Sequence, residues 1–244
     1  MTLLPNERID DLQFRGLKII QNPQYFCFGM DAVLLSHFAR LKKADRAADL
    51  GTGTGILPLL LWGRYEFIHM TGIEIQSNIA DMASRSVSLN NLDEKITIIN
   101  EDLRNFGFGS QAGTMDAVIS NPPYKKAGSG LPSITDTQAI ARHEITCRLE
   151  DITACASRLL RNGGRFFTIN HSDRIIELIE LMRQYKLEPK RLRLIQPRID
   201  KPPNLVLAEG VKNSRPHVSF EPALIIYNPD GSPTRELDEI YHRI

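Results

Sequence analysis

The stretch Asn121-Pro-Pro-Tyr124 places hydrogen-bond acceptors and a flat aromatic ring directly after an apolar, strand-like run, Asp116–Ser120. An NH2 group conjugated to a ring or a carbonyl is a poor nucleophile, because its lone pair is delocalised. Acceptors on both sides, here the Asn121 side-chain oxygen and the Pro122 carbonyl, would hold both hydrogens and localise that pair. Tyr124 offers a face on which an extruded base can stack. The stretch predicts a site for a planar amine with Asn121, Pro122 and Tyr124 as catalytic residues; the alternative is a Pro-Pro turn that only closes a strand.

Earlier in the chain, the turn Asp49-Leu-Gly-Thr-Gly-Thr-Gly55 carries a glycine at every second position. Glycines let the backbone turn sharply and approach a ligand closely. The spacing G-x-G-x-G differs from the G-x-G-x-x-G of dinucleotide-binding proteins, which cradles a pyrophosphate. Asp49 at the start of the turn suits a cationic or zwitterionic ligand and would repel a diphosphate. These features favour the methionine moiety of S-adenosylmethionine over NAD.

Two further carboxylates follow predicted strands. Glu74 ends the second strand, where an acid can accept hydrogen bonds from both ribose hydroxyls of a nucleoside. Asp102, with Leu103, follows the third strand and can accept from an adenine amine. Because the carboxyl ends of parallel strands meet at one edge of a sheet, we expect Asp49, Glu74 and Asp102 to face the same ligand.

Two shorter stretches add to these motifs: Phe28-Gly-Met-Asp-Ala-Val-Leu-Leu35 before the glycine turn and Ala141-Arg-His-Glu144 after the amine site. Together they resemble class I methyltransferases of the N-P-P-Y type, and most of all the bacterial tRNA1(Val) adenosine-37 N6-methyltransferases. The resemblance implies that Asn121, Pro122 and Tyr124 hold a target adenine. It also implies that S-adenosylmethionine is bound by Asp31, Asp49, Gly51, Gly53, Glu74, Asp102, Leu103 and Asn121. For Asp31 the alternative is a cap on the helix that it opens.

Four carriers present a suitable amine: adenine in RNA, adenine in DNA, guanine N2 in RNA, and protein glutamine. The short segment ahead of Asp49 does not look like the helical substrate domain of glutamine methyltransferases. The chain also lacks the room for a large target-recognition domain typical of DNA adenine methyltransferases, and the duplicated half of many guanine-N2 enzymes. We therefore favour an unpaired adenine flipped out of a folded RNA, most simply tRNA next to the anticodon. A non-catalytic RNA-binding protein and a nicotinamide oxidoreductase are the alternatives outside this class.

The charge pattern indicates where RNA would bind. The net charge of the chain is only +1, but the segment from Arg183 to Arg215 contains nine Lys or Arg residues and only three acids. This basic segment, 183–215, together with the loop 125–136 that begins with Lys125 and Lys126, is predicted to contact phosphates. The alternative for the basic segment is a solvated surface without a ligand.

These residues require a sheet that brings their strand ends together. Strand and helix patterns alternate after residue 45, which predicts a Rossmann-like α/β fold with a seven-stranded, mostly parallel sheet and helices on both faces. The segment 1–45 is expected to form a short N-terminal cap on the domain 46–244. Expected strands are 46–50, 68–75, 96–100, 116–120 and 165–170, then 191–196, 205–211 and 223–227 at an antiparallel edge. Expected helices are 31–41, 55–64, 79–91, 149–160 and 174–185, the fourth stopped by Asn162-Gly163-Gly164.

Composition limits the remaining possibilities. The 244 residues are 42% hydrophobic, enough for a sizeable core, and no apolar run has the ~18 residues of a membrane span. The N-terminus lacks an export signal pattern. Three cysteines (Cys27, Cys147, Cys155) form no C-x-x-C pair, which favours reduced thiols in the cytoplasm over zinc or disulfides. We expect no metal, no membrane partner, and a monomer rather than an oligomer.

Overall fold

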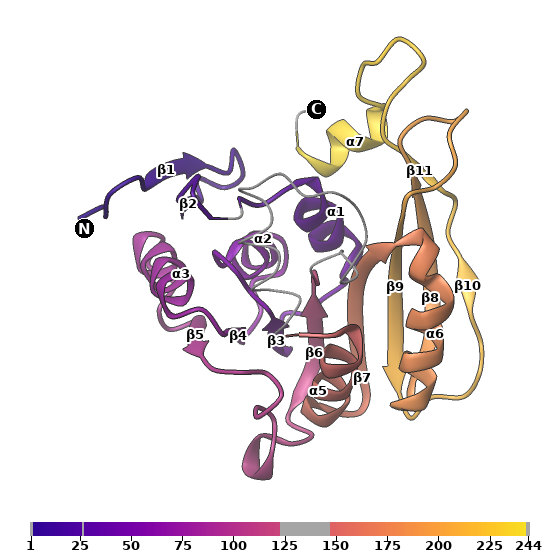
Figure 1. Cartoon of the computed structure of the whole chain (residues 1–244), viewed down its shortest axis with the longest axis horizontal. Coiled ribbons are helices and arrows are strands. Elements are labelled where there is room, and N and C mark those ends of the chain that lie inside the picture. Colours follow the sequence, from indigo (N-terminus) through magenta and orange to yellow (C-terminus); the bar gives the residue numbers. More distant parts are fainter. Residues whose placement is uncertain (1, 26, 123–146, 243–244) are drawn as a thin grey trace.

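Five parallel strands form the half of the central sheet nearest the predicted site in the computed structural model, which describes residues 2–25, 27–122 and 147–242. Their order across the sheet is β5-β4-β3-β6-β7 (Figure 1). They are β3 (Arg46–Leu50), β4 (His69–Glu74), β5 (Ile96–Asn100), β6 (Met115–Ser120) and β7 (Leu160–His171). The chain runs outward from β3 to β5 and then crosses back to β6, so strand order reverses between β3 and β6. Ligands of open α/β sheets bind at such a reversal, beyond the carboxyl ends of the strands.

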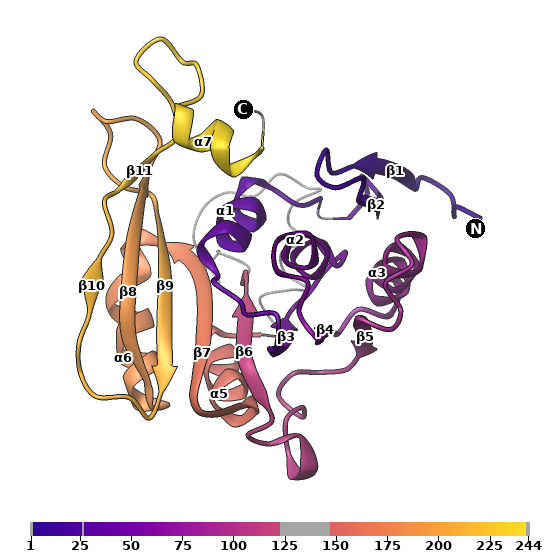
Figure 2. The same ribbon diagram turned by 180° about the vertical axis from the view of Figure 1, so that it is seen from behind.

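An antiparallel edge completes the sheet beyond β7. Strand β9 (Leu205–Lys212) runs antiparallel to both β7 and β8 (Leu187–Gln196). The short strands β10 (Ser219–Phe220) and β11 (Leu224–Ile225) pair parallel with β8 at the outer edge, as Figure 2 shows from behind. The predicted fold class is therefore confirmed, with seven long strands and two short ones in place of the single strand expected over 223–227.

Helices cover both faces of this sheet, because successive side chains along its strands are buried on opposite faces. Ile119 and Phe167 join the core cluster that includes α1 (Met30–Phe38), α2 (Ile56–Tyr65) and α7 (Arg235–Ile240). Their neighbours Val118 and Phe166 join the opposite cluster, with α5 (Leu149–Leu159) and α6 (Ile175–Gln184). The helix α3 (Ser77–Leu89) follows β4. Short 3-10 turns occupy Gly109–Gln111 (η1) and Ser172–Arg174 (η2).

The N-terminal segment packs against helix α3 and strand β7. Strands β1 (Arg8–Asp11) and β2 (Lys18–Gln21) pair antiparallel as a separate two-stranded sheet. Ile20 of β2 packs against Ile79 and Met82 of α3, and its amide donates to Ser86 Oγ at 3.0 Å. Helix α1 packs edge-on through Phe38 against Phe167 of β7, with ring centroids 6.4 Å apart.

The predicted end of the fourth helix was wrong, and two other boundaries also differ: α1 ends at Phe38 and not at 41, and β8 begins at Leu187 and not at 191. Helix α5 ends at Leu159, its C-cap Leu160 is already extended, and Gly163 and Gly164 lie inside β7. The register between β6 and β7 shifts between Met115 and Ala117, which pair with Leu160 and Arg165. The glycine pair thus serves an irregular stretch of strand, where Gly163 has φ +77°, and does not cap the helix.

Candidate functional site

The carboxyl ends of four parallel strands meet at the predicted site. Leu50 of β3 lies opposite Ile73 of β4, and Glu74 lies opposite Asn100 of β5. On the other side, Asp49 lies opposite Ile119 of β6. The glycine turn, Glu74 and the start of the amine stretch therefore share one edge, as the sequence predicted.

The glycine turn is anchored to β4 and open on its other side. The amides of Gly51 and Thr52 donate to the Ile73 carbonyl at 2.9 and 3.0 Å. Gly51 and Gly53 have φ of +72° and +55°, and a Cβ at either would meet no atom within 4 Å. Side chains rarely adopt these angles, so glycine keeps this backbone unstrained and exposed to a ligand.

Asp49 is buried completely, and neither carboxyl oxygen forms a hydrogen bond within the described chain. Burial, opposed by the Thr52 hydroxyl and assisted by the nearby Glu74 carboxylate, raises the pKa of Asp49 to about 7. That hydroxyl lies close to the carboxyl, but its geometry completes no hydrogen bond. A buried carboxyl without partners is costly, and a cationic group bound at the turn would relieve that cost.

Glu74 joins the glycine turn to the start of helix α3. One carboxylate oxygen accepts from the Gly53 amide at 3.1 Å and the other from the Gln76 amide at 2.9 Å. Asn100 adds a second tie, because its side-chain amide donates to the Glu74 and Ile75 carbonyls at 2.8 and 3.0 Å. Each carboxylate oxygen retains a lone pair, so Glu74 can still accept from the hydroxyls of a ribose.

Replacing Glu74 by glutamine should loosen this turn. One of the two backbone amides would then face an NH2 donor, at a cost of about 1–3 kcal/mol. We expect the Tm to fall by roughly 2–10 °C and the affinity for S-adenosyl compounds to fall about 10-fold. Differential scanning fluorimetry and calorimetry measure both. The exposed acid Glu94 gives the matched control Glu94→Gln, which should change neither quantity; an unaltered Glu74→Gln variant would contradict the assignment.

Asp102 and Leu103 follow β5 at the same edge. The Asp102 carboxylate accepts from the Arg104 guanidinium, with Nε contacts of 3.0 and 2.9 Å, and this hydrogen bonding holds the pKa of Asp102 below its usual range. Leu103 is buried, and its carbonyl accepts from Arg158 at 3.1 Å. An ionised Asp102 suits the predicted adenine contact, although it must share its oxygens with Arg104.

The amine stretch is tied directly to the glycine turn. Ser120, fully buried at the end of β6, donates from its hydroxyl to the Leu50 carbonyl at 2.8 Å. Asn121 follows it half-buried, and Pro122 is buried. Tyr124, the loop 125–136 and Ala141–Glu144 lie outside the described residues. Two of the three predicted catalytic residues are thus placed beside the turn.

Asp31 occupies the first turn of α1, whose N-cap is Gly29. The alternative that Asp31 caps this helix is therefore wrong, although an acid in a first turn still interacts favourably with the helix dipole. Its carboxylate makes no hydrogen bond or ion pair with another described side chain. Its contact with the cofactor stays a prediction.

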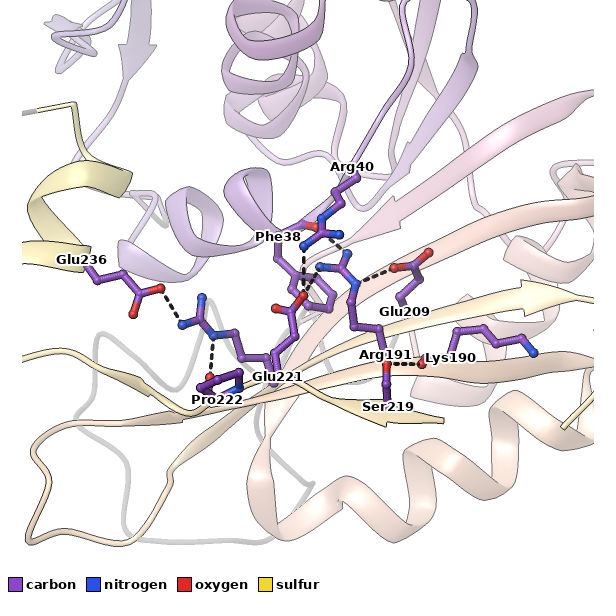
Figure 3. Close-up of polar contacts among 10 residues, drawn as sticks. Phe38, Arg40, Lys190, Arg191, Glu209, Ser219, Glu221, Pro222 and Glu236 are labelled. Atoms are coloured by element: carbon purple, nitrogen blue, oxygen red, sulfur yellow. Dashed lines mark hydrogen bonds and ion pairs between the residues drawn. The ribbon is translucent and has the colours of Figure 1, made fainter. Parts of the chain in front are cut away.

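Some cations of the basic segment 183–215 form ion pairs and hydrogen bonds within the protein. Arg191 is buried on the Phe38 ring, 3.8 Å from its centroid, and pairs with Glu209 at 2.7 Å and Glu221 at 3.0 Å. Its guanidinium also donates to the Phe38 carbonyl, which attaches α1 to β8 (Figure 3). Arg193 likewise pairs with Glu236 of α7. These two cations face protein partners. Three others in the segment are exposed: Lys201 lies between β8 and β9 at the carboxyl edge of the parallel strands, whereas Lys186 and Arg215 lie at the opposite edge, where β8 begins and β9 ends.

Three supporting residues were missed by sequence reasoning: Thr52, Asn100 and Ser120. Asn100 and Ser120 each end a strand, so a search for polar residues at strand ends would have found them, and Thr52 belongs to the glycine turn itself. In the described part of the chain, no group of three His, Cys, Asp or Glu side chains could hold a metal ion. No described helix is long and apolar enough to cross a membrane.

Comparison with known proteins relates this geometry to a family. Residues 18–185 match the model of the methyltransferase small domain. The chain is 31% identical over 206 residues to the tRNA1(Val) (adenine(37)-N6)-methyltransferase of Porphyromonas gingivalis, covering 82% of this chain and 80% of that protein. A protein of the same name from Tolumonas auensis is 28% identical over 244 residues, covering 95% and 96%.

Among solved structures, a predicted O-methyltransferase from Agrobacterium tumefaciens superposes with a TM-score of 0.70 at 24% identity. The match covers 87% of this chain and 96% of that one. This likeness shows that the two chains share the fold.

Proposed function

Because the chain belongs to the methyltransferase small domain family and, within it, to the tRNA1(Val) (adenine(37)-N6)-methyltransferases, we propose that it methylates the N6 amine of an unpaired adenine in tRNA, at position 37 next to the anticodon. S-adenosyl-L-methionine is the methyl donor. The observation that carries the proposal is the direct tie between the two half-sites, the Ser120 hydroxyl bonded to the Leu50 carbonyl. It holds the amine stretch beside the glycine turn.

The described residues fit this cofactor. The two unpartnered oxygens of Asp49 suit an ammonium group. The open faces of Gly51 and Gly53 let a ligand approach the backbone, and Glu74 and Asp102 can accept from ribose hydroxyls and an adenine amine. When bound, S-adenosylmethionine supplies a methyl group activated by its sulfonium. Asp31 and Leu103 are proposed as further contacts.

The amine stretch prepares the nucleophile. The Asn121 side-chain oxygen and the Pro122 carbonyl accept the two amine hydrogens, which turns the nitrogen lone pair toward the methyl donor. Tyr124 is proposed to stack on the flipped base. Positioning supplies most of the rate, since an in-line displacement depends on near-attack geometry. No strong general base is required, because the methylated amine is acidic before it loses its proton to water.

The RNA is proposed to lie across the carboxyl edge of the sheet. Of the exposed cations in the basic segment, Lys201 lies at this edge, between β8 and β9. Lys201 and the lysines of loop 125–136 would neutralise phosphates, so binding should weaken as salt concentration rises. We further propose that the protein works in the cytoplasm, as a monomer and without a metal.

Mass spectrometry tests the function directly. The protein is incubated with S-adenosylmethionine carrying a deuterated methyl group and with total tRNA from a strain that lacks its gene, next to a DNA sample. We expect labelled N6-methyladenosine in tRNA alone. Label in N2-methylguanosine would show that the target base is wrong, and label in DNA would show that the carrier is wrong. The absence of label in every nucleoside would contradict the proposed function itself.

A further inference from the structure

The side chain of Asn170, at the carboxyl end of β7, is the clearest polar group that the proposed mechanism does not use. It is 1% exposed. Its Nδ2 donates to the Thr168 hydroxyl at 3.0 Å, while its Oδ1 has no hydrogen-bond partner among the described residues. Buried amide oxygens in native proteins are nearly always paired, so an unpaired one indicates a missing partner.

The position of Asn170 indicates what that partner is. Four buried side-chain atoms lack a hydrogen bond in the described residues: both Asp49 carboxyl oxygens, the Thr52 hydroxyl and Asn170 Oδ1. The first three lie at the end of β3 and the fourth at the end of β7. These strands flank β6, at whose end the amine stretch begins. Strand alternation puts Asn170 on the face of Phe166 and Asp49 on the opposite face, that of Ala47.

The sheet register brings Asn170 beside the start of that stretch. Thr168 of β7 pairs with Ser120 of β6, and Asn170 lies two residues further along in the same direction. On its other side Asn170 pairs with Val206 of β9, which is buried and apolar. The neighbouring strand therefore offers no side-chain donor to its amide oxygen.

We propose that Asn170 is a substrate-contacting residue whose amide oxygen accepts a hydrogen bond from the target nucleotide. This inference rests on the proposed function. The donors of an adenosine are its N6 amine and its ribose 2′-hydroxyl. Because Asn121 and Pro122 already accept the two amine hydrogens, a contact with the amine would share one of these hydrogens in a three-centre bond. A contact with the 2′-hydroxyl would distinguish RNA from DNA. The Thr168 hydroxyl keeps the amide oriented, since it accepts from Nδ2.

The near-isosteric variant Asn170→Leu tests the role, with Asn90→Leu as the matched control. Asn90 makes three hydrogen bonds, to the Lys18 amide, the Lys18 carbonyl and the Ser86 carbonyl. Its replacement should lower the Tm and leave kcat/KM unchanged. Asn170→Leu should keep or raise the Tm, keep S-adenosylmethionine affinity, and lower kcat/KM on tRNA about 10-fold or more. A fall in Tm like that of Asn90→Leu would show a structural role and overturn the inference.

Substrate variants separate the two donors. Anticodon stem-loops with adenosine or 2′-deoxyadenosine at the target are compared with wild-type protein and Asn170→Leu. If the 2′-hydroxyl is the donor, the deoxy substrate lowers kcat/KM for wild type only. If the amine is the donor, the deoxy change affects both proteins by the same factor. Equal kcat/KM of the two proteins on the ribose substrate overturns the inference alone, whereas inactive wild-type protein overturns the proposed function and the inference with it.

Discussion

Replacing Asn121 by alanine is expected to lower kcat roughly 1000-fold, equal to about 4 kcal/mol of transition-state stabilisation. The lone pair of a conjugated amine is directed only while both hydrogens are held, and alanine removes one of the two acceptors. The remaining acceptor, the Pro122 carbonyl, belongs to the backbone and stays in place. The loss should appear in kcat, because the missing contact strengthens as the nitrogen becomes the nucleophile.

Cofactor binding separates this effect from a damaged site. The ties that hold the glycine turn run through Glu74, Ser120 and the Ile73 carbonyl. Isothermal titration with S-adenosylhomocysteine should therefore give a Kd within about threefold of wild type. Asn105→Ala, at an exposed asparagine between β5 and β6, should keep full activity. An Asn121→Ala variant that turns over at the wild-type rate would contradict the proposed mechanism.

The parallel half of the sheet could be predicted closely from sequence. The apolar runs predicted the bounds of β3 and β5 as they stand in the structure. Strand β3 is a buried parallel strand, which reads as a short apolar segment, whereas β5 lies at the edge of the sheet and buries only Ile96. The start of β7 could not be predicted, since Asn162-Gly163-Gly164 is typical of a helix end and only the pairing of Leu160 with Met115 makes it strand.

The candidate site likewise has a part that could be predicted from the sequence and a part that could not. The glycine turn and the carboxylates are local motifs, and their shared edge follows from topology. Arg191 was counted among the cations predicted to contact phosphates. Its actual partners Glu209, Glu221 and Phe38 are far away in sequence, so no local pattern indicates the pairing. Asn170 was missed for a related reason: whether a buried amide is paired depends on tertiary neighbours.

Asp49→Asn is expected to weaken S-adenosylmethionine binding about 100-fold while making the ligand-free protein more stable above pH 7. A buried carboxylate that gains an ammonium partner contributes several kcal/mol to that partner's binding, and an amide does not. In the ligand-free protein the same carboxylate has no hydrogen bond with a described residue. It therefore favours binding at the expense of stability, as groups in functional sites often do.

The pKa of Asp49 sets the pH window for both effects. It is raised by burial from 3.8 to about 7 in the folded protein, so between these values the folded state holds more protons than the unfolded state. The free energy of unfolding of wild type therefore decreases as pH rises from about 4 to 7, by up to about 4 kcal/mol. The neutral amide of the Asp49→Asn variant carries no such penalty, so the Tm advantage of this variant should be absent near pH 4 and full above pH 7.

Binding should show the opposite trend. Because an ammonium ligand prefers the ionised carboxylate, wild-type affinity should rise between pH 5 and 7, and binding should release a proton in that window. Asp49→Asn should bind weakly without this rise, while Asp200→Asn, at an exposed acid, should behave as wild type. Calorimetry in buffers of different ionisation enthalpy counts the released proton. A wild-type affinity that is flat from pH 5 to 7 would mean that Asp49 does not contact the cationic end of the cofactor.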